Sequence, residues 1–140
     1  MGLRRKSREI ALQFLFGHDF LKLPGDAESV ERELVRFLES FEVGGKALPY
    51  AAELIRGICG NLEEIDERVR SRSHNWRLER MSTVDRNILR IAVYEMLHGT
   101  DVPARVAINE ALEIAKQYST PDSVAFINGI LDGVVPAAEK

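Results

Sequence analysis

Apolar residues recur at three- and four-residue steps along most of the chain, which is the period of an amphipathic α-helix. The alternation that is typical of strands is nearly missing. The first helix is predicted from about Leu3 to Leu21, and Asp26 is suited to cap the next one. A long helix is predicted after Pro49, with apolar positions in register as far as Val69.

The second half of the chain continues this helical period. Residues 70–81 are polar and basic, and we expect a short helix or a loop there, anchored by Trp76. Ser82 or Thr83 can cap a helix that ends near Gly99 and is apolar around most of its circumference. Such a helix usually lies in the middle of a domain. Its narrow polar stripe consists of Arg86, Arg90, Tyr94 and His98.

The last two predicted helices meet at a tight corner. Pro103 disfavours a helical residue before it and so marks the start of the first of them. Thr120 can cap the second helix, Pro121 suits its first position, and Asp122 adds negative charge at the positive end of its dipole. A helix start can bind a phosphate, and a half-exposed Phe126 can stack on a base, although core packing is the alternative for this ring.

Together these elements predict an all-α fold of about seven helices, arranged as two small helical bundles packed on each other. We expect a single domain over residues 1–140, a length that can bury a real core. The net charge of −3 excludes a globally basic nucleic-acid binder, but it does not exclude a local basic patch.

Catalytic and metal-binding patterns are weak. Cys59 is the only cysteine, which excludes an intrachain disulfide and fits a reducing compartment. The histidines are scattered, and neither a Gly-rich phosphate loop nor a nucleophile elbow is present. We therefore expect a protein that is not an enzyme and that holds no metal and no cofactor.

The N-terminus superficially imitates a secretory signal peptide, because basic residues precede the apolar run IALQFLF. Glu9 and Gln13 interrupt this pattern, and no small-residue cleavage site follows. No apolar run approaches the roughly 18 residues that a membrane span needs. We expect a cytoplasmic protein that does not enter a membrane.

Basic residues gather at two places. Four of the 19 lie within the first eight positions, namely Arg4, Arg5, Lys6 and Arg8. Residues 26–67 carry the opposite sign, and this separation suits capture of a phosphate backbone, with a solvated terminus as the alternative. A second series consists of Arg68, Arg70, Arg72, Arg77 and Arg80. For this series we favour a solubilised loop whose arginines pair with nearby glutamates.

The chain contains the segments RRKSREIALQFLF, VDRNILRIAVYEML, DVPARVAINEALEIAKQYS and DSVAFINGILD in this order. Together these segments resemble the NusB family of transcription antitermination factors. The arginine-rich start and first helix of that family are similar to RRKSREIALQFLF, and its central helix is similar to VDRNILRIAVYEML. Its last two helices are similar to DVPARVAINEALEIAKQYS and DSVAFINGILD. The joint occurrence of these segments in this order is more specific than any one of them, although residues 22–80 carry little of the match.

The resemblance implies an all-helical, non-enzymatic factor that binds the boxA element of nascent ribosomal RNA leaders. Members of the family do so together with NusE, a small-subunit ribosomal protein, and join the antitermination complex on RNA polymerase. Some members also form a homodimer that buries the RNA-binding face.

Carried over by position, the resemblance assigns two groups of site residues. Contacts with single-stranded RNA fall to Arg4, Arg5, Lys6, Arg8, Asp122 and Phe126. An interface with NusE falls to Asp85, Arg86, Ile88, Leu89 and Arg90 at the start of the central helix. Two other functions stay open: an RNA-binding module related to the N-terminal domain of ribosomal RNA cytosine methyltransferases, and a helical scaffold that binds only protein.

Overall fold

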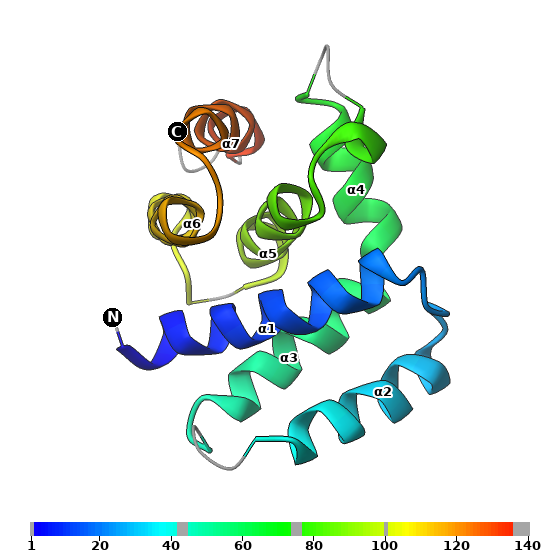
Figure 1. Ribbon diagram of the computed structural model, residues 1–140. Coiled ribbons are helices and arrows are strands. Elements are labelled where there is room, and N and C mark those ends of the chain that lie inside the picture. The colour runs from blue at the N-terminus through cyan, green and yellow to red at the C-terminus, as the bar shows by residue number, and fades with distance from the viewer. Residues whose placement is uncertain (1, 42–44, 74–76, 100, 136–140) are drawn as a thin grey trace. The chain divides into compact units, whose positions relative to one another are not determined.

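A computed structural model describes residues 2–41, 45–73, 77–99 and 101–135 of the chain (Figure 1). This part of the chain is built from helices and their connections, with no strand, so the predicted all-α fold is confirmed. The helices are α1 (Gly2–Phe20), α2 (Ala27–Glu39), α3 (Leu48–Gly60), α4 (Leu62–Arg70), the 3₁₀ helix η1 (Leu78–Arg80), α5 (Thr83–His98), α6 (Ala104–Tyr118) and α7 (Pro121–Val134).

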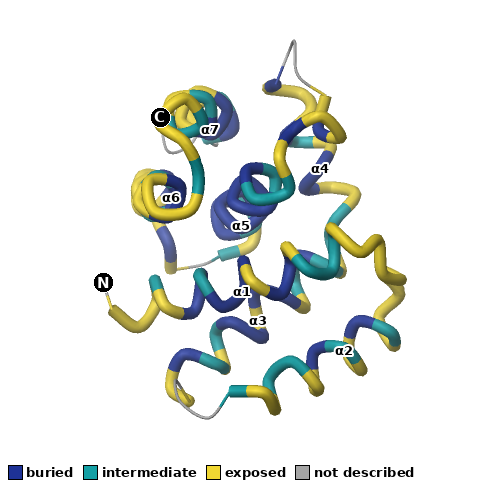
Figure 2. The backbone as a smooth tube through the Cα atoms, viewed as in Figure 1, coloured by how far each residue is buried: buried dark blue, intermediate teal, exposed yellow. Residues whose placement is uncertain are grey.

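The helices form two compact units, residues 1–61 and residues 62–140. In the first unit, α1 and α2 both pack against α3. In the second unit, α5 contacts α4, α6 and α7 and is buried along most of its length, as Figure 2 shows. The apolar helix predicted to lie in the middle therefore forms the centre of the second unit.

The apolar face of α1 is buried, as predicted. The four side chains predicted to point inward are each no more than 3% exposed, namely Ile10, Ala11, Phe14 and Leu15. Phe14 meets Phe37 of α2 edge-on, with ring centroids 5.3 Å apart. Ser7 lies on the same inward face and donates a hydrogen bond of 2.8 Å to the carbonyl oxygen of Ala47.

Two carboxylates at the surface hold α2. Asp26 caps the helix as predicted, because its side chain accepts a 3.0 Å hydrogen bond from the backbone N–H of Ser29, and hydrogen bonds with Ser29 lower the pKa of Asp26. Glu31 accepts two hydrogen bonds of 2.9 Å from Arg56 of α3. These bonds lower the pKa of Glu31 and raise the pKa of Arg56. Both carboxylates are therefore charged at neutral pH.

The single long helix predicted after Pro49 is wrong, because Asn61 divides it into α3 and α4. The backbone of Asn61 leaves the helical region, with φ −128° and ψ 25°. Its N–H donates to the Ile58 carbonyl at 3.1 Å, and its side-chain amide donates to the Gly57 carbonyl at 2.8 Å. Local hydrogen bonds of this kind compete with the helical ladder. A break of one residue hardly shifts the apolar period, so the pattern alone does not reveal it.

Helices of the second unit begin at their predicted caps. Ser82 caps α5 by accepting a backbone N–H at 3.0 Å, and α6 begins directly after Pro103. Thr120 caps α7 in the same way, accepting the N–H of Ser123 at 3.1 Å. The basic segment before α5 contains η1, and its predicted anchor, Trp76, lies outside the described residues.

The polar stripe predicted along α5 needs a correction at Arg90, which is only 8% exposed. Its guanidinium donates two hydrogen bonds to the Asp66 carboxylate of α4, at 2.8 and 2.9 Å. A third hydrogen bond reaches Oδ1 of Asn87 at 3.0 Å, and Asn87 donates to the Thr83 carbonyl at 2.8 Å. This position of the stripe thus holds α4 against α5.

Candidate nucleic-acid interface

The corner between α6 and α7 places polar groups and an aromatic ring at the surface of the second unit. Pro121 begins α7, and Asp122 follows it and is exposed. Phe126 lies one turn later on the same helix and is half-buried. The first turns of α7 therefore carry a carboxylate and an aromatic ring one turn apart.

A buried carboxylate ties this corner to the start of α5. Asp85 is 7% exposed, and its Oδ1 accepts a 2.5 Å hydrogen bond from Oγ of Ser119. Its Oδ2 accepts a 2.6 Å hydrogen bond from Oγ of Ser123. The two serines flank the corner, one directly after α6 and one in the first turn of α7. Because hydrogen bonds to a charged acceptor are strong at these distances, Asp85 fixes how α7 begins.

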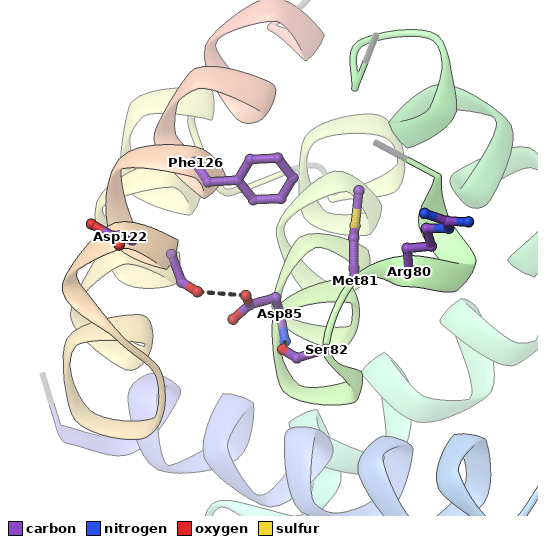
Figure 3. A pocket seen from close by; sticks show the side chains of 7 residues that line it. Arg80, Met81, Ser82, Asp85, Asp122 and Phe126 are labelled. Carbon is purple, nitrogen blue, oxygen red and sulfur yellow. Dashed lines mark hydrogen bonds between the residues drawn. The ribbon is translucent and has the colours of Figure 1, made fainter. Parts of the chain in front are cut away.

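A pocket of about 360 Å³ lies beside the corner. Its lining residues come from η1, the start of α5 and the start of α7, and they are Arg80, Met81, Ser82, Asp85, Asp122, Ser123 and Phe126. Figure 3 shows the Phe126 ring and the Met81 side chain pointing toward each other, whereas Asp122 points away from the ring. The pocket thus joins Asp122 and Phe126, which were predicted to contact RNA, with Asp85, which was predicted for a protein interface.

The groups around the pocket are of the kinds that can bind an unpaired nucleotide. An exposed edge of an aromatic ring such as Phe126 can stack on a base, a contact that every base allows. The carboxylate of Asp122 can accept hydrogen bonds from the amino group on a base edge. The guanidinium of Arg80 fits the oxygens of a phosphate. The arrangement is suited to binding.

The four basic residues predicted to contact RNA all lie on α1 in the first unit, and they differ in exposure. Arg4 and Lys6 are exposed, and Arg5 is half-buried. The guanidinium of Arg4 lies 3.9 Å from the ring centroid of Tyr50, which is a cation–π contact. Arg8 is only 4% exposed because it falls on the inward face of α1. Solvent therefore reaches Arg4, Arg5 and Lys6, whereas Arg8 is nearly covered.

Most of the residues predicted for a protein interface at the start of α5 belong to the core. Ile88 and Leu89 are 2% and 0% exposed. Asp85 holds the two serines, and Arg90 holds the ion pair with α4. Arg86 is half-buried, and its Nη1 lies 3.4 and 3.5 Å from two carbonyl oxygens of the segment before α5. Of the five, Arg86 has the most surface for a docked partner to touch.

The sequence did not identify several residues that shape the pocket. The sequence predicts Arg80 as part of a solubilising series, and it carries no signal for Met81. Ser119 and Ser123 were not expected to matter either, because their bonds to Asp85 join residues 34 and 38 positions apart. Ser123 carries a local signal as the partner of the Thr120 cap, but its second role depends on tertiary packing.

Metal-binding clusters and membrane-spanning helices are both missing from the residues that Figure 1 draws as ribbon. Over these residues, no group of three or more His, Cys, Asp or Glu side chains could hold a metal ion. No helix among them is long and apolar enough to cross a membrane. Cys59 is half-buried in α3.

Comparison with known proteins decides the family. A model of the NusB family matches residues 5–136. The chain belongs to the NusB family. One relative, named transcription antitermination protein NusB, comes from Desulfosudis oleivorans and is 46% identical over 134 residues. That match spans 96% of this chain and 86% of the relative, so it includes the region between residues 22 and 80 where the resemblance was weak.

Solved NusB structures have the same fold. A NusB structure from T. maritima matches with a TM-score of 0.81 at 40% identity, covering 98% of this chain and 93% of that one. A chain in the crystal structure of the antitermination factors NusB and NusE in complex with double-stranded RNA matches with a TM-score of 0.74. That match is 23% identical and covers 96% of both chains, so it supports the NusB fold alone.

Proposed function

We propose that the chain is a transcription antitermination factor that binds boxA RNA of ribosomal RNA operons together with NusE. In this role it acts in the cytoplasm, supports the processivity of RNA polymerase and works by binding, without catalysis and without a cofactor. The name of its relatives and the partners in the related NusB–NusE–RNA structure both support this direction.

The pocket at the α6–α7 corner is the observation that carries the proposal. Its volume of about 360 Å³ lies in the range of pockets that hold small molecules. Phe126 stacks on an unpaired base, and Asp122 accepts hydrogen bonds from a base edge. Contacts with base edges give the sequence preference that phosphate contacts lack. Asp85 holds the corner in one arrangement before RNA arrives, so less ordering is needed on binding.

The start of α1 supplies the part of the affinity that does not depend on sequence. Arg4, Arg5 and Lys6 neutralise phosphates and release counterions, so binding weakens as the salt concentration rises. Arg8, with 4% of its surface exposed, supports α1 from the inward side. This local cluster makes RNA binding compatible with a net charge of −3.

NusE adds a second RNA-binding surface, so the affinity of the complex rises through effective concentration. We place its interface around the start of α5, where Arg86 reaches the surface. The buried residues predicted there act as its support: Asp85, Ile88, Leu89 and Arg90 keep α5 in place. The complex joins the antitermination machinery on RNA polymerase, and a homodimer that covers the RNA-binding residues is a competing state.

The proposal is tested by fluorescence anisotropy with labelled boxA RNA, titrated with the protein alone and with NusE, at two salt concentrations. Affinity should rise when NusE is added and fall with salt. A scrambled RNA of the same composition should bind more weakly than boxA. Equal binding of both RNAs, with or without NusE, would contradict the proposal. Sedimentation of the same samples tells an inactive dimer from a monomer that binds only protein.

A further inference from the structure

Three exposed arginines in the second unit carry positive charges, and only Arg80 among them lines the pocket. Arg72 follows α4, Arg77 precedes η1, and Arg80 ends η1. We refer to these three residues as the arginine strip. The surrounding sequence, residues 68–80, contains five arginines and a single acidic residue, Glu79.

The expectation that nearby glutamates neutralise these arginines is wrong for the strip. Oε1 of Glu64 lies within hydrogen-bond distance of Nε2 of His98, at 2.9 Å. Glu67 lies 3.8 Å from Arg70, which is not part of the strip. Within the described residues, no hydrogen bond or ion pair engages the three guanidinium groups of the strip. Their charges are therefore available to an anionic ligand.

The strip begins at the pocket and reaches the far end of α7. Arg80 lines the pocket together with Phe126, near the start of that helix. Arg72 lies at its last turn, where its side-chain carbons pass Gly133 so closely that a Cβ there would sit 3.3 Å from Cδ of Arg72. Because an α-helix rises 1.5 Å per residue, the stretch from Phe126 to Gly133 is roughly 10 Å long. At roughly 3.4 Å per stacked nucleotide, this corresponds to about three nucleotides.

We propose that the arginine strip binds the phosphate backbone of the RNA segment that continues past the base held in the pocket. This inference rests on the proposed function and extends its RNA footprint. Guanidinium groups fit phosphate oxygens in a bidentate manner, and such contacts do not depend on the base. The protein therefore covers more RNA than it reads, and the added segment can have any sequence.

The test compares three labelled RNAs: the boxA element alone, and the element extended by a short run of uridines at its 5′ or at its 3′ end. The double substitution Arg72→Gln and Arg77→Gln removes two charges of the strip and leaves the pocket intact. Arg105→Gln is the matched control, because Arg105 is an exposed arginine on α6 of the same unit. Melting curves of each variant check that it is folded.

For the unchanged protein, one of the two extensions should tighten binding by roughly fivefold, as two exposed charge pairs suggest. The double substitution should abolish this gain and lower the salt slope on the extended RNA by about 0.7 for each arginine. It should leave the affinity for the element alone unchanged, and Arg105→Gln should change neither quantity.

The inference is overturned if neither extension tightens binding, or if the double substitution acts no more strongly than Arg105→Gln. An equal loss on the short and the extended RNA also contradicts it, because the strip would then touch the element itself. None of these three results would contradict the proposed function. If the unchanged protein does not bind the element at all, the proposed function fails and the inference fails with it.

Discussion

The two units of the chain hold their helices with polar contacts of different kinds. In the first unit, the side chains of Arg56 and Glu31 join α3 to α2 while 53% and 47% exposed. In the second unit, the side chains of Arg90 and Asp66 join α5 to α4 while only 9% and 10% exposed. Asp85, also in the second unit, is 7% exposed and binds two serines at the α6–α7 corner.

The unit with the buried polar contacts is also the unit that contains the pocket of the candidate site. Exposed ion pairs are screened by solvent and orient their partners weakly. Buried, fully hydrogen-bonded groups fix the elements that carry them in one arrangement. The pocket needs side chains from η1, α5 and α7 at set positions, so it depends on such groups. The four basic residues of the first unit that were predicted to contact RNA all lie on α1 and need no comparable network.

Breaking the buried ion pair should have the largest effect. Asp66→Ala leaves the guanidinium of Arg90 buried and charged without its main partner, which costs about 3–5 kcal/mol of unfolding free energy. Urea denaturation followed by circular dichroism measures this loss. Glu31→Ala is the matched change in the first unit and should move the midpoint far less, because that pair is half exposed. Equal shifts for the two variants would show that burial does not separate the units.

Removing the ring of the pocket should have the next largest effect, on RNA binding. Stacking of one base on an aromatic ring is worth about 1–3 kcal/mol, so Phe126→Ala should weaken boxA binding by about 5- to 150-fold. Phe20→Ala is the control, since Phe20 is a 63% exposed aromatic residue of the first unit. Anisotropy titrations with boxA RNA measure the loss of affinity in both variants. Equal losses would show that Phe126 does not stack on a base.

Weakening the Asp85 carboxylate, which holds the α6–α7 corner, should have a smaller effect on stability and on RNA binding. Asp85→Asn replaces one acceptor oxygen by a donor, and we expect a loss of about 1 kcal/mol in unfolding free energy together with weaker boxA binding. Combining it with Ser123→Ala should cost less than the sum of the two single changes, since both remove the same hydrogen bond. Strict additivity in thermal melts would mean that the two residues do not act together.

The smallest expected effect concerns acid stability of the first unit. Hydrogen bonds from Arg56 hold the pKa of Glu31 below its ordinary value of 4.5. A lowered pKa in the folded state means that this carboxylate adds stability above pH 4.5 and loses that contribution as the pH falls through the folded-state pKa. Glu31→Gln should therefore lose slightly less stability than the unchanged protein between pH 7 and pH 3 in urea titrations. A larger loss in the variant would contradict this sign.

Helix positions followed from the sequence because their determinants are local. Asp26, Ser82 and Thr120 cap the helices that the sequence assigned to them, since a cap acts within three residues of itself. The break at Asn61 was not predictable from the apolar pattern, because its hydrogen bonds replace helical ones without shifting the apolar period. Polar Arg90 was placed on a stripe because periodicity does not tell a solvated charge from a paired, buried one.

The residues of the candidate site could be predicted from the sequence less completely than the helix positions. The cap at Thr120 and the proline after it predict a helix start, and Asp122 and Phe126, which lie near that start, line the pocket. Its other walls come from residues that are distant in the sequence, and only tertiary packing brings them together. The start of α5 illustrates the limit: Ile88 and Leu89 were expected near a partner, yet they lie in the core, because an apolar helix in the centre of a bundle has little outward face.

The most direct test of the account separates base recognition at the corner from phosphate binding at the start of α1. The measurement is the ratio of affinities for boxA and a base-substituted boxA, together with the salt slope, for Asp122→Asn and Arg5→Ala. We expect Asp122→Asn to change the ratio and leave the slope, and Arg5→Ala to lower the slope by about 0.7 and leave the ratio. If Arg5→Ala changes the ratio while Asp122→Asn leaves it intact, the two regions do not have the roles assigned to them here.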